Sequence, residues 1–284
     1  DGKTYTVTNN LSGTNTLQYS LNQNTGVITL NGSDLKIEAV SNEQALINIR
    51  GDNNIVNGSS LADRITIEQG SNNVINGLDG NDTLTMNSEN NSISGGNGND
   101  NIILNASTNL SVTGGAGADT ITINSDNNTN ISSGTGNDVI NVNGSNNNIN
   151  AEDGNNTINV SKGGNTIKSG NGDNRFVITS SSNTITAGNG NNSLGIQGDS
   201  NNVTVQNASG DINIYGSNNT ITNTRGENDV TIKGSGNSYS SMTGTKEITV
   251  TGNSNNVLTG SGDDSITVKG NENTIESTGG TNVI

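Results

Sequence analysis

Apolar residues recur along this chain as pairs separated by one polar residue, and the pairs repeat at a nearly fixed interval. Ile121 and Ile123 form one such pair, and successive pairs begin 18 or 19 residues apart. Alternation with a period of two indicates a half-buried β-strand, so each pair predicts one strand. The first members of the regular pairs are Ile47, Ile65, Leu84, Ile102, Ile121, Ile140, Ile158, Phe176, Leu194, Ile212, Val230, Ile248, Ile266 and Ile284.

A second apolar series lies between the pairs and predicts a second strand in each repeat. Two short strands per repeat of fixed length, divided by turn residues, are typical of a solenoid. We therefore expect an all-β fold, a single right-handed parallel β-solenoid of about 15 coils of about 18 residues with two strands per coil. The second series comprises Ile55, Val74, Ile93, Val112, Ile131, Ile149, Ile167, Ile185, Val203, Ile221, Tyr239, Val257 and Ile275.

The repeat is looser at the start of the chain, where the apolar pairs at Tyr5, Leu17 and Ile28 are less evenly spaced. We expect residues 1–46 to form irregular N-terminal coils of the solenoid and residues 47–284 to form the regular repeats. The last residues fall within another first strand, and an unpaired solenoid end tends to recruit another chain. The solenoid is therefore expected to continue past Ile284 or to stack end to end.

Composition taken alone would indicate disorder, but the regular placement of the apolar residues overrides it. Only 26% of the residues are hydrophobic and 2% are aromatic, which is close to disordered chains. Burial of a few aliphatic side chains per coil cannot offset the entropy of ordering about 18 residues. Hydrogen bonds and polar side-chain ladders between coils must therefore contribute.

The net charge and the absence of three residue types limit the partners and the chemistry that the chain can support. The formal net charge of −15 disfavours nucleic acid and anionic membranes and leaves cations as partners. The chain has no His, Cys or Pro, so imidazole and thiolate chemistry are excluded. We expect no nucleic-acid binding and no membrane insertion.

One polar column is expected to be structural. Asparagine stands two residues before the second apolar series, and stacked side-chain amides can hydrogen-bond from coil to coil. Leu110 and Thr129 interrupt the column, and an Asn-lined binding surface is the functional alternative. The column comprises Asn53, Asn72, Asn91, Asn147, Asn165, Asn183, Asn201, Asn219, Asn237, Asn255 and Asn273.

A second polar column stands two residues before the first apolar series and predicts a cation site. Consecutive aspartates stacked about 5 Å apart repel one another, and a bound cation would relieve the conflict. Calcium fits because it accepts carboxylates and backbone carbonyls in flexible geometry. The column reads Asp63, Asp82, Asp100, Asp119, Asp138, Asn156, Asn174, Asn192, Gly210, Asn228, Lys246, Asp264 and Asn282.

Glycines before these aspartates complete a nonapeptide pattern. Residues 95–103 and 114–122 match G-G-x-G-x-D-x-U-x, and residues 77–85, 133–141 and 259–267 each lack one glycine. Here the chain resembles the calcium-binding β-roll repeats of RTX proteins, and it is similar to the 19-residue calcium-bound repeats of a bacterial RTX ice-binding adhesin region. The resemblance implies structural Ca²⁺ at Gly77, Gly80, Asp82, Gly95, Gly96, Gly98, Asp100, Gly114, Gly115, Gly117, Asp119, Gly134, Gly136, Asp138 and Asp264.

The pattern departs from typical β-rolls because only one of the two turns in each coil carries it. From Asn156 to Asn192 the glycines remain while asparagine replaces aspartate, as expected of a column that exchanges a cation for an amide ladder. The alternative is that the aspartates only cap backbone amides in the turns.

The outward positions predict no active site. The four arginines are widely separated, and outward strand residues are mostly Thr, Asn and Ser. We expect a non-enzymatic extracellular structural or adhesive module of a bacterial cell surface: an adhesin stalk, a surface-layer protein or a fibre. Partners would be calcium, the chain itself end to end, or a host surface or glycan. The alternatives are an ice-binding solenoid with Thr rows, and a β-helix that binds or cleaves polysaccharide.

Overall fold

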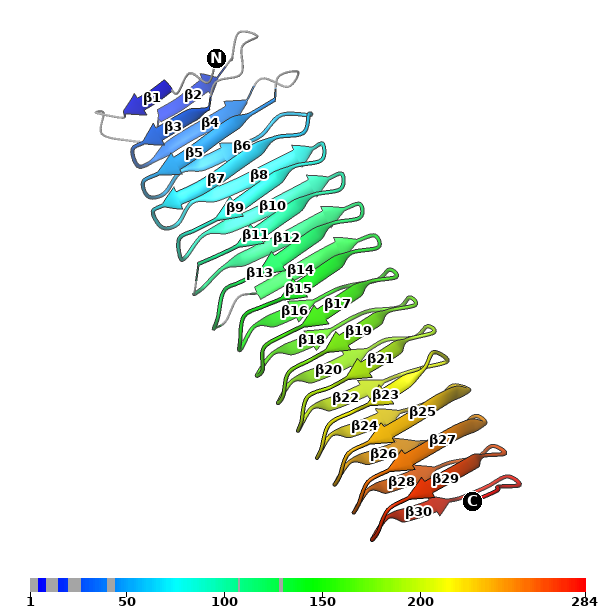
Figure 1. Cartoon of the computed structure of the whole chain (residues 1–284). Coiled ribbons are helices and arrows are strands. Elements are labelled where there is room, and N and C mark those ends of the chain that lie inside the picture. The colour runs from blue at the N-terminus through cyan, green and yellow to red at the C-terminus, as the bar shows by residue number, and fades with distance from the viewer. Residues whose placement is uncertain (1–4, 9–14, 20–26, 40–43, 107, 128–129) are drawn as a thin grey trace. The chain divides into compact units, whose positions relative to one another are not determined.

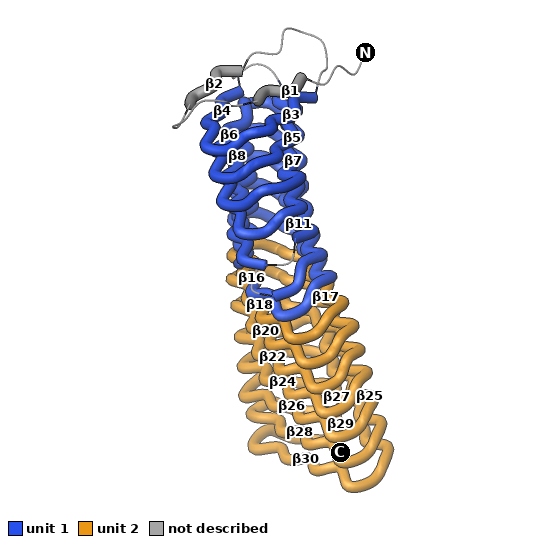
Figure 2. Tube along the Cα trace, turned by 90° about the vertical axis from the view of Figure 1, so that its left-hand side faces the viewer, with its two compact units in different colours: residues 1–148 blue, residues 149–284 orange. Residues whose placement is uncertain are grey.

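The computed structural model describes residues 5–8, 15–19, 27–39, 44–106, 108–127 and 130–284. All the regular secondary structure in these ranges is β-strand. The chain divides into two compact units, Asp1–Asn148 and Ile149–Ile284 (Figure 2). The predicted all-β solenoid of parallel coils of about 18 residues with two strands each is confirmed. The boundary expected between residues 46 and 47 stays a prediction. Within the described ranges no helix could cross a membrane.

In the first unit each coil gives one strand to each of two parallel sheets (Figure 1). The first sheet comprises β1 (Tyr5–Thr8), β3 (Ile28–Asn31), β5 (Leu46–Arg50), β7 (Arg64–Gln69), β9 (Thr83–Met86), β11 (Asn101–Leu104), β13 (Thr120–Ile123) and β15 (Val139–Val142). The second comprises β2 (Asn15–Tyr19), β4 (Leu35–Ala39), β6 (Ile55–Asn57), β8 (Val74–Asp79), β10 (Ser92–Asn97), β12 (Ser111–Ala116) and β14 (Asn130–Thr135). Strand β16 (Asn148–Asn150) includes the last residue of this unit.

The second unit repeats the arrangement. Its first sheet comprises β17 (Thr157–Val160), β19 (Arg175–Ile178), β21 (Ser193–Ile196), β23 (Ile212–Ile214), β25 (Asn228–Lys233), β27 (Lys246–Thr251) and β29 (Ser265–Lys269). Its second comprises β18 (Thr166–Lys168), β20 (Thr184–Ala187), β22 (Asn202–Val205), β24 (Thr220–Asn223), β26 (Ser238–Ser241), β28 (Asn256–Thr259) and β30 (Thr274–Ser277).

The core of each unit is a set of stacks of equivalent apolar side chains between the two sheets. In the first unit Ile102 is in register with Leu84 on one side and Ile121 on the other. In the second unit Phe176 is in register with Ile158 and Leu194. These side chains are buried. The 18- or 19-residue step therefore places like residues above one another, as expected of stacked parallel coils.

The predicted second series is wrong by one residue in two early coils. Ile55 is exposed and Val74 half-buried, whereas Val56 and Ile75 are buried in the core. The cause lies in the preceding turn, where the first asparagine of an Asn-Asn pair adopts a left-handed conformation with φ near 59°. Asparagine tolerates that conformation, so the second member of the pair enters the buried column.

The asparagine column is therefore confirmed with two corrections, since the inward residues are Asn54 and Asn73 rather than Asn53 and Asn72. Leu110 interrupts the column as a buried residue, and Thr129 lies outside the described residues. Asn219 shows the bonding. Its Oδ1 accepts the backbone N–H of Asn201 at 2.8 Å, and its Nδ2 donates to the carbonyl oxygen of Gly198 at 2.9 Å. Each amide thus joins neighbouring coils.

Replacing Asn219 with alanine is expected to destabilise the second unit by about 2–6 kcal/mol. The substitution would leave the Asn201 N–H and the Gly198 carbonyl unpaired inside the turn, and each buried unpaired group costs about 1–3 kcal/mol. Urea unfolding measures the change. Thr220→Ala is the matched control because Thr220 is exposed on the next position of the chain. Equal stability of the two variants would contradict a structural role for the column.

The outward threonine rows expected of an ice-binding surface are short. Thr186, Thr204 and Thr222 lie in register, but Lys168 precedes them and Ser240 follows them. In the first unit the row of Thr66 and Thr85 ends at Ile103. Neither sheet therefore presents a continuous threonine face at these positions.

Candidate metal centre

The aspartate column of the first unit is buried in the turns that lead into β9, β11, β13 and β15. Asp82, Asp100, Asp119 and Asp138 are each at most 2% exposed. In each carboxylate, Oδ1 accepts the backbone N–H of the preceding aspartate of the column, at 2.8–2.9 Å. The structure thus brings the predicted aspartates together as one continuous stack, one per coil.

The second carboxylate oxygen has no such partner in three of these turns. Oδ2 of Asp82, Asp100 and Asp119 is buried and accepts no hydrogen bond. A buried carboxylate oxygen without a donor is costly unless a proton or a cation is bound to it.

A glycine and a carbonyl oxygen face each of these oxygen atoms. A Cβ on Gly77 would lie 2.1 Å from Oδ2 of Asp82 and 2.4 Å from the carbonyl oxygen of Gly95. Both oxygens therefore border the same small space. Gly95 faces Asp100 in the same way, and Gly114 faces Asp119 together with the carbonyl oxygen of Ser133. The arrangement yields three equivalent positions, one per coil.

The remaining predicted glycines are required by the backbone. They adopt left-handed φ values between 98° and 140°, and a Cβ on most of them would overlap a carbonyl oxygen of the preceding coil. Leu78 occupies the equivalent position in the first of these turns with φ 83° and an exposed side chain. The left-handed glycines are Gly80, Gly96, Gly98, Gly115, Gly117, Gly134 and Gly136.

Burial changes the acidity of the column. It raises the pKa of Asp82 to about 7, against the lowering effect of the Asp63 backbone N–H, and the charges of Asp100 and Asp63 raise it further. Burial likewise raises the pKa of Asp119 to about 6 and raises the pKa of Asp100. The charged form of these carboxylates is therefore disfavoured until a cation is present.

Asp63 continues the column but differs from the four that follow. Its Oδ2 accepts the backbone N–H of Ser59 at 2.5 Å and its Oδ1 accepts the Ser59 hydroxyl at 2.9 Å. Protein donors thus satisfy both oxygens, so Asp63 acts as a turn cap. This is the turn-capping alternative raised by the sequence, and here it holds for one residue.

In the second unit, amide groups take the place of the second carboxylate oxygen. Nδ2 of Asn174 donates to the carbonyl oxygen of Gly172 at 2.9 Å, and Nδ2 of Asn192 donates to that of Gly188 at 2.9 Å. Their Oδ1 atoms accept backbone N–H groups of the preceding coil as the aspartates do. The amide N–H therefore donates a hydrogen bond that a carboxylate cannot donate.

Asp264, the remaining predicted ligand, lies apart from the others in the second unit. Its Oδ1 accepts the backbone N–H of Lys246 at 2.9 Å, and its Oδ2 is buried without a hydrogen-bond donor. The residue one coil earlier in its column is thus a lysine instead of an aspartate. The sequence places Lys246 in this column but gives no signal of what its side chain contacts.

Backbone oxygens dominate these turns. Among the described residues no group of three or more acidic side chains converges where it could hold a metal ion. Any ion would therefore depend on carbonyl oxygens as well as on carboxylates, which suits a hard cation such as calcium with its six to eight oxygen ligands.

Two family models match the chain. The RTX calcium-binding nonapeptide repeat matches residues 69–102, 77–109, 111–129, 123–158, 132–167 and 152–177. A protein family of unknown function, DUF3060, matches residues 177–238 and 232–284. No curated protein and no solved structure gave a significant match. The matched repeats and the β-solenoid fold agree with the RTX-like β-roll inferred from the nonapeptides.

Proposed function

We propose that this chain is a non-enzymatic structural solenoid whose first unit is stabilised by bound calcium. The chain carries RTX-like calcium-binding repeats over most of residues 69–177. The proposal adds that it serves as an extracellular module of a bacterial cell surface, such as an adhesin stalk, a surface-layer protein or a fibre.

The observation that carries the calcium part is the set of buried Oδ2 atoms in the first unit. Each faces a backbone carbonyl oxygen with no donor between them. Two facing oxygens attract a cation and repel each other without one. In the second unit an amide nitrogen lies in the corresponding turns and donates to turn carbonyls.

The ligands would be the carboxylates of Asp82, Asp100, Asp119 and Asp138 together with carbonyl oxygens of the glycine turns. Gly77, Gly95 and Gly114 leave room at these positions because they lack a Cβ. Bound calcium would neutralise the stacked carboxylates and join successive coils. Its role is structural, because stacking of the coils is what holds a solenoid together.

The outer surface supports the structural and adhesive part of the proposal. Outward strand residues are mostly short and neutral, and the described residues contain two ion pairs, Lys36 with Glu38 and Arg50 with Glu68. General acid–base chemistry needs perturbed groups positioned in a cleft, whereas the perturbed aspartates here are enclosed in turns. Weak calcium sites agree with the proposed extracellular setting, because extracellular modules bind calcium with a Kd of about 10⁻⁴–10⁻³ M. We do not extend the proposal to ice binding, because the threonine rows are interrupted.

Calcium titration of the purified chain tests the proposal, and Gly95→Ala is the informative variant. The new Cβ would lie 2.2 Å from Oδ2 of Asp100 and 2.4 Å from the carbonyl oxygen of Gly114. We expect wild-type protein to bind several calcium ions and the variant to bind at least one fewer. Overpacking should also cost about 1–3 kcal/mol of stability.

Gly195→Ala is the matched control, since a Cβ there would meet only the carbonyl oxygen of Phe176, at 3.8 Å. Its calcium binding and stability should equal those of the wild type. Absence of calcium binding by the wild type would contradict the proposal, as would an equal loss in both glycine variants. Isothermal titration calorimetry measures the stoichiometry.

A further inference from the structure

A lysine ammonium group lies inside one turn of the second unit. Lys246 is only 2% exposed, which is unusual for a lysine. Its Nζ donates to the carbonyl oxygens of Gly226 at 2.6 Å, Thr243 at 2.7 Å and Gly244 at 2.6 Å. All three donor positions of the ammonium are thus used on backbone oxygens, and one of these oxygens belongs to the preceding coil.

Lys246 stands in the same column as the aspartates of the first unit, at the 18-residue step between Asn228 and Asp264. Its side chain enters the turn from the column position that the aspartates hold in the first unit, and its Nζ donates to the carbonyl oxygen two residues earlier, as Nδ2 of Asn174 does. The three carbonyl oxygens around Nζ form a cradle of the kind that a hard cation prefers. The ammonium is the cation in this turn.

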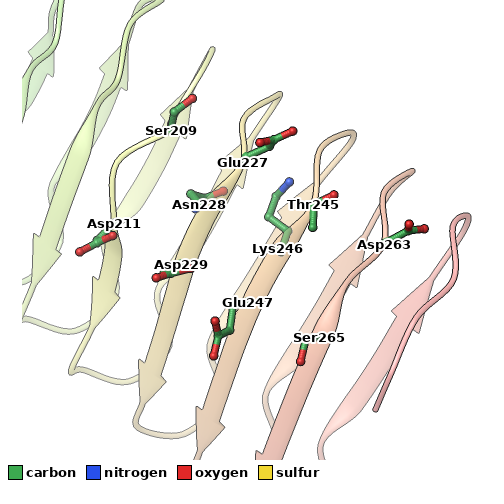
Figure 3. A pocket seen from close by; sticks show the side chains of 10 residues that line it. All are labelled: Ser209, Asp211, Glu227, Asn228, Asp229, Thr245, Lys246, Glu247, Asp263 and Ser265. Atoms are coloured by element: carbon green, nitrogen blue, oxygen red, sulfur yellow. The ribbon is translucent and has the colours of Figure 1, made fainter.

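Burial lowers the pKa of Lys246, and the charges of Asp264 and Glu227 oppose that lowering by favouring the ammonium form. Figure 3 shows Lys246 extended toward the turns beside Thr245, whereas Asp229 and Glu247 lie farther along the strands. These residues border an open hollow of about 470 Å³. The lysine does not extend toward the acidic side chains along the outer face of the sheet.

We infer that this turn is a cation site that the chain fills with its own ammonium group, and that replacing Lys246 with aspartate opens it to one calcium ion. The inference rests in part on the proposed function, because it assigns to the second unit the turn chemistry proposed for the first. In the variant, the carbonyl oxygens of Gly226, Thr243 and Gly244 would remain, and the carboxylate introduced at position 246 would join them in holding the ion.

A consequence concerns Asp264, which the nonapeptide pattern predicted as a calcium ligand. The charge of the Lys246 ammonium acts on Asp264 without forming an ion pair, and it lessens the need for a metal ion in the wild-type turn. The calcium requirement would then be confined to the first unit. The second unit would be closed by amides at Asn174 and Asn192 and by the ammonium of Lys246.

The test compares the full-length wild type with Lys246→Asp, counting bound calcium by equilibrium dialysis and following thermal unfolding with calcium and in calcium-free buffer. We expect Lys246→Asp to bind one more ion than the wild type. We also expect its second unit to unfold at a lower temperature without calcium and to recover when calcium is added.

Two further variants complete the design. Lys246→Asn supplies an amide like its column neighbours, so it should stay folded and bind no additional ion. Lys269→Asp makes the same charge change at an exposed position and should also bind no additional ion.

Three results would overturn the inference: an unchanged ion count in Lys246→Asp, a Lys246→Asp protein that stays unfolded in saturating calcium, or an equal gain in Lys269→Asp. The readout is a difference from the wild type. A wild type that binds no calcium would therefore contradict the proposed function while leaving this comparison decisive for Lys246.

Discussion

Replacing Asp82, Asp100 and Asp119 together with asparagine is expected to leave the first unit folded and to remove most of its response to calcium. The second unit shows why the fold should survive. Asn174 and Asn192 hold the same column with Oδ1 on a backbone N–H and Nδ2 on a turn carbonyl. An amide in the first unit can make the same two kinds of bond, with the carbonyl oxygen that now faces Oδ2 as acceptor.

The wild type should behave in the opposite way when calcium is withdrawn. A site saturated about 100-fold above its Kd adds about 2.7 kcal/mol to stability. Three such sites would add about 8 kcal/mol, which is comparable to the whole stability of many domains. We therefore expect the first unit of the wild type to unfold well below the second in excess chelator, as followed by circular dichroism on heating.

The triple variant with alanine at the same three positions separates amide closure from loss of charge. Alanine removes the acceptors of the backbone N–H groups of Asp63, Asp82 and Asp100, so this variant should be unstable with or without calcium. A triple asparagine variant that still responds fully to calcium would contradict the assignment of the ligands. If chelator does not shift the wild-type melting curve, the aspartates only cap backbone amides in the turns and hold no calcium.

Most of the fold can be predicted from the sequence, because the same repeat length applies to every coil. A fixed step of 18 or 19 residues aligns Ile102 with Leu84 and Ile121, and all three side chains are buried. The Asn-Asn pairs were ambiguous by comparison. Either member of Asn53–Asn54 could enter the column, and the choice depends on which one adopts the left-handed turn conformation. A periodicity of side-chain types does not record that choice.

The stacking of the aspartate column could be predicted from the sequence, but its hydrogen bonds could be predicted only in part. Stacked aspartates preceded by glycines indicate a cation from the residue pattern alone. The sequence could not show that Ser59 satisfies Asp63, because that depends on the direction of one hydroxyl and one N–H. It also could not show that Lys246 folds back onto three carbonyls, since a lysine in a turn is ordinarily solvated.

In calcium-free solution the first unit is expected to lose stability as the pH rises from about 4 to about 7. Burial raises the pKa of Asp82 to about 7 and that of Asp119 to about 6, from an ordinary value of 3.8. Between the ordinary and the raised pKa the folded chain holds protons that the unfolded chain has released. Stability is therefore greatest at or below about pH 4 and falls as the pH passes the folded pKa values.

Calcium should flatten or reverse this slope, because the metal binds the deprotonated carboxylate and competes with the proton. Melting temperatures measured across this pH range, in buffer stripped of calcium by a chelating resin and again with millimolar calcium, test the prediction. The triple asparagine variant is the control and should show little slope, since its amides do not titrate. A calcium-free wild type whose stability rises from pH 4 to pH 7 would show that the facing oxygens of the turns are satisfied by something other than a proton. The raised pKa values would then not describe this column, whereas a falling slope that calcium removes would indicate that protons and calcium compete for the same buried oxygens.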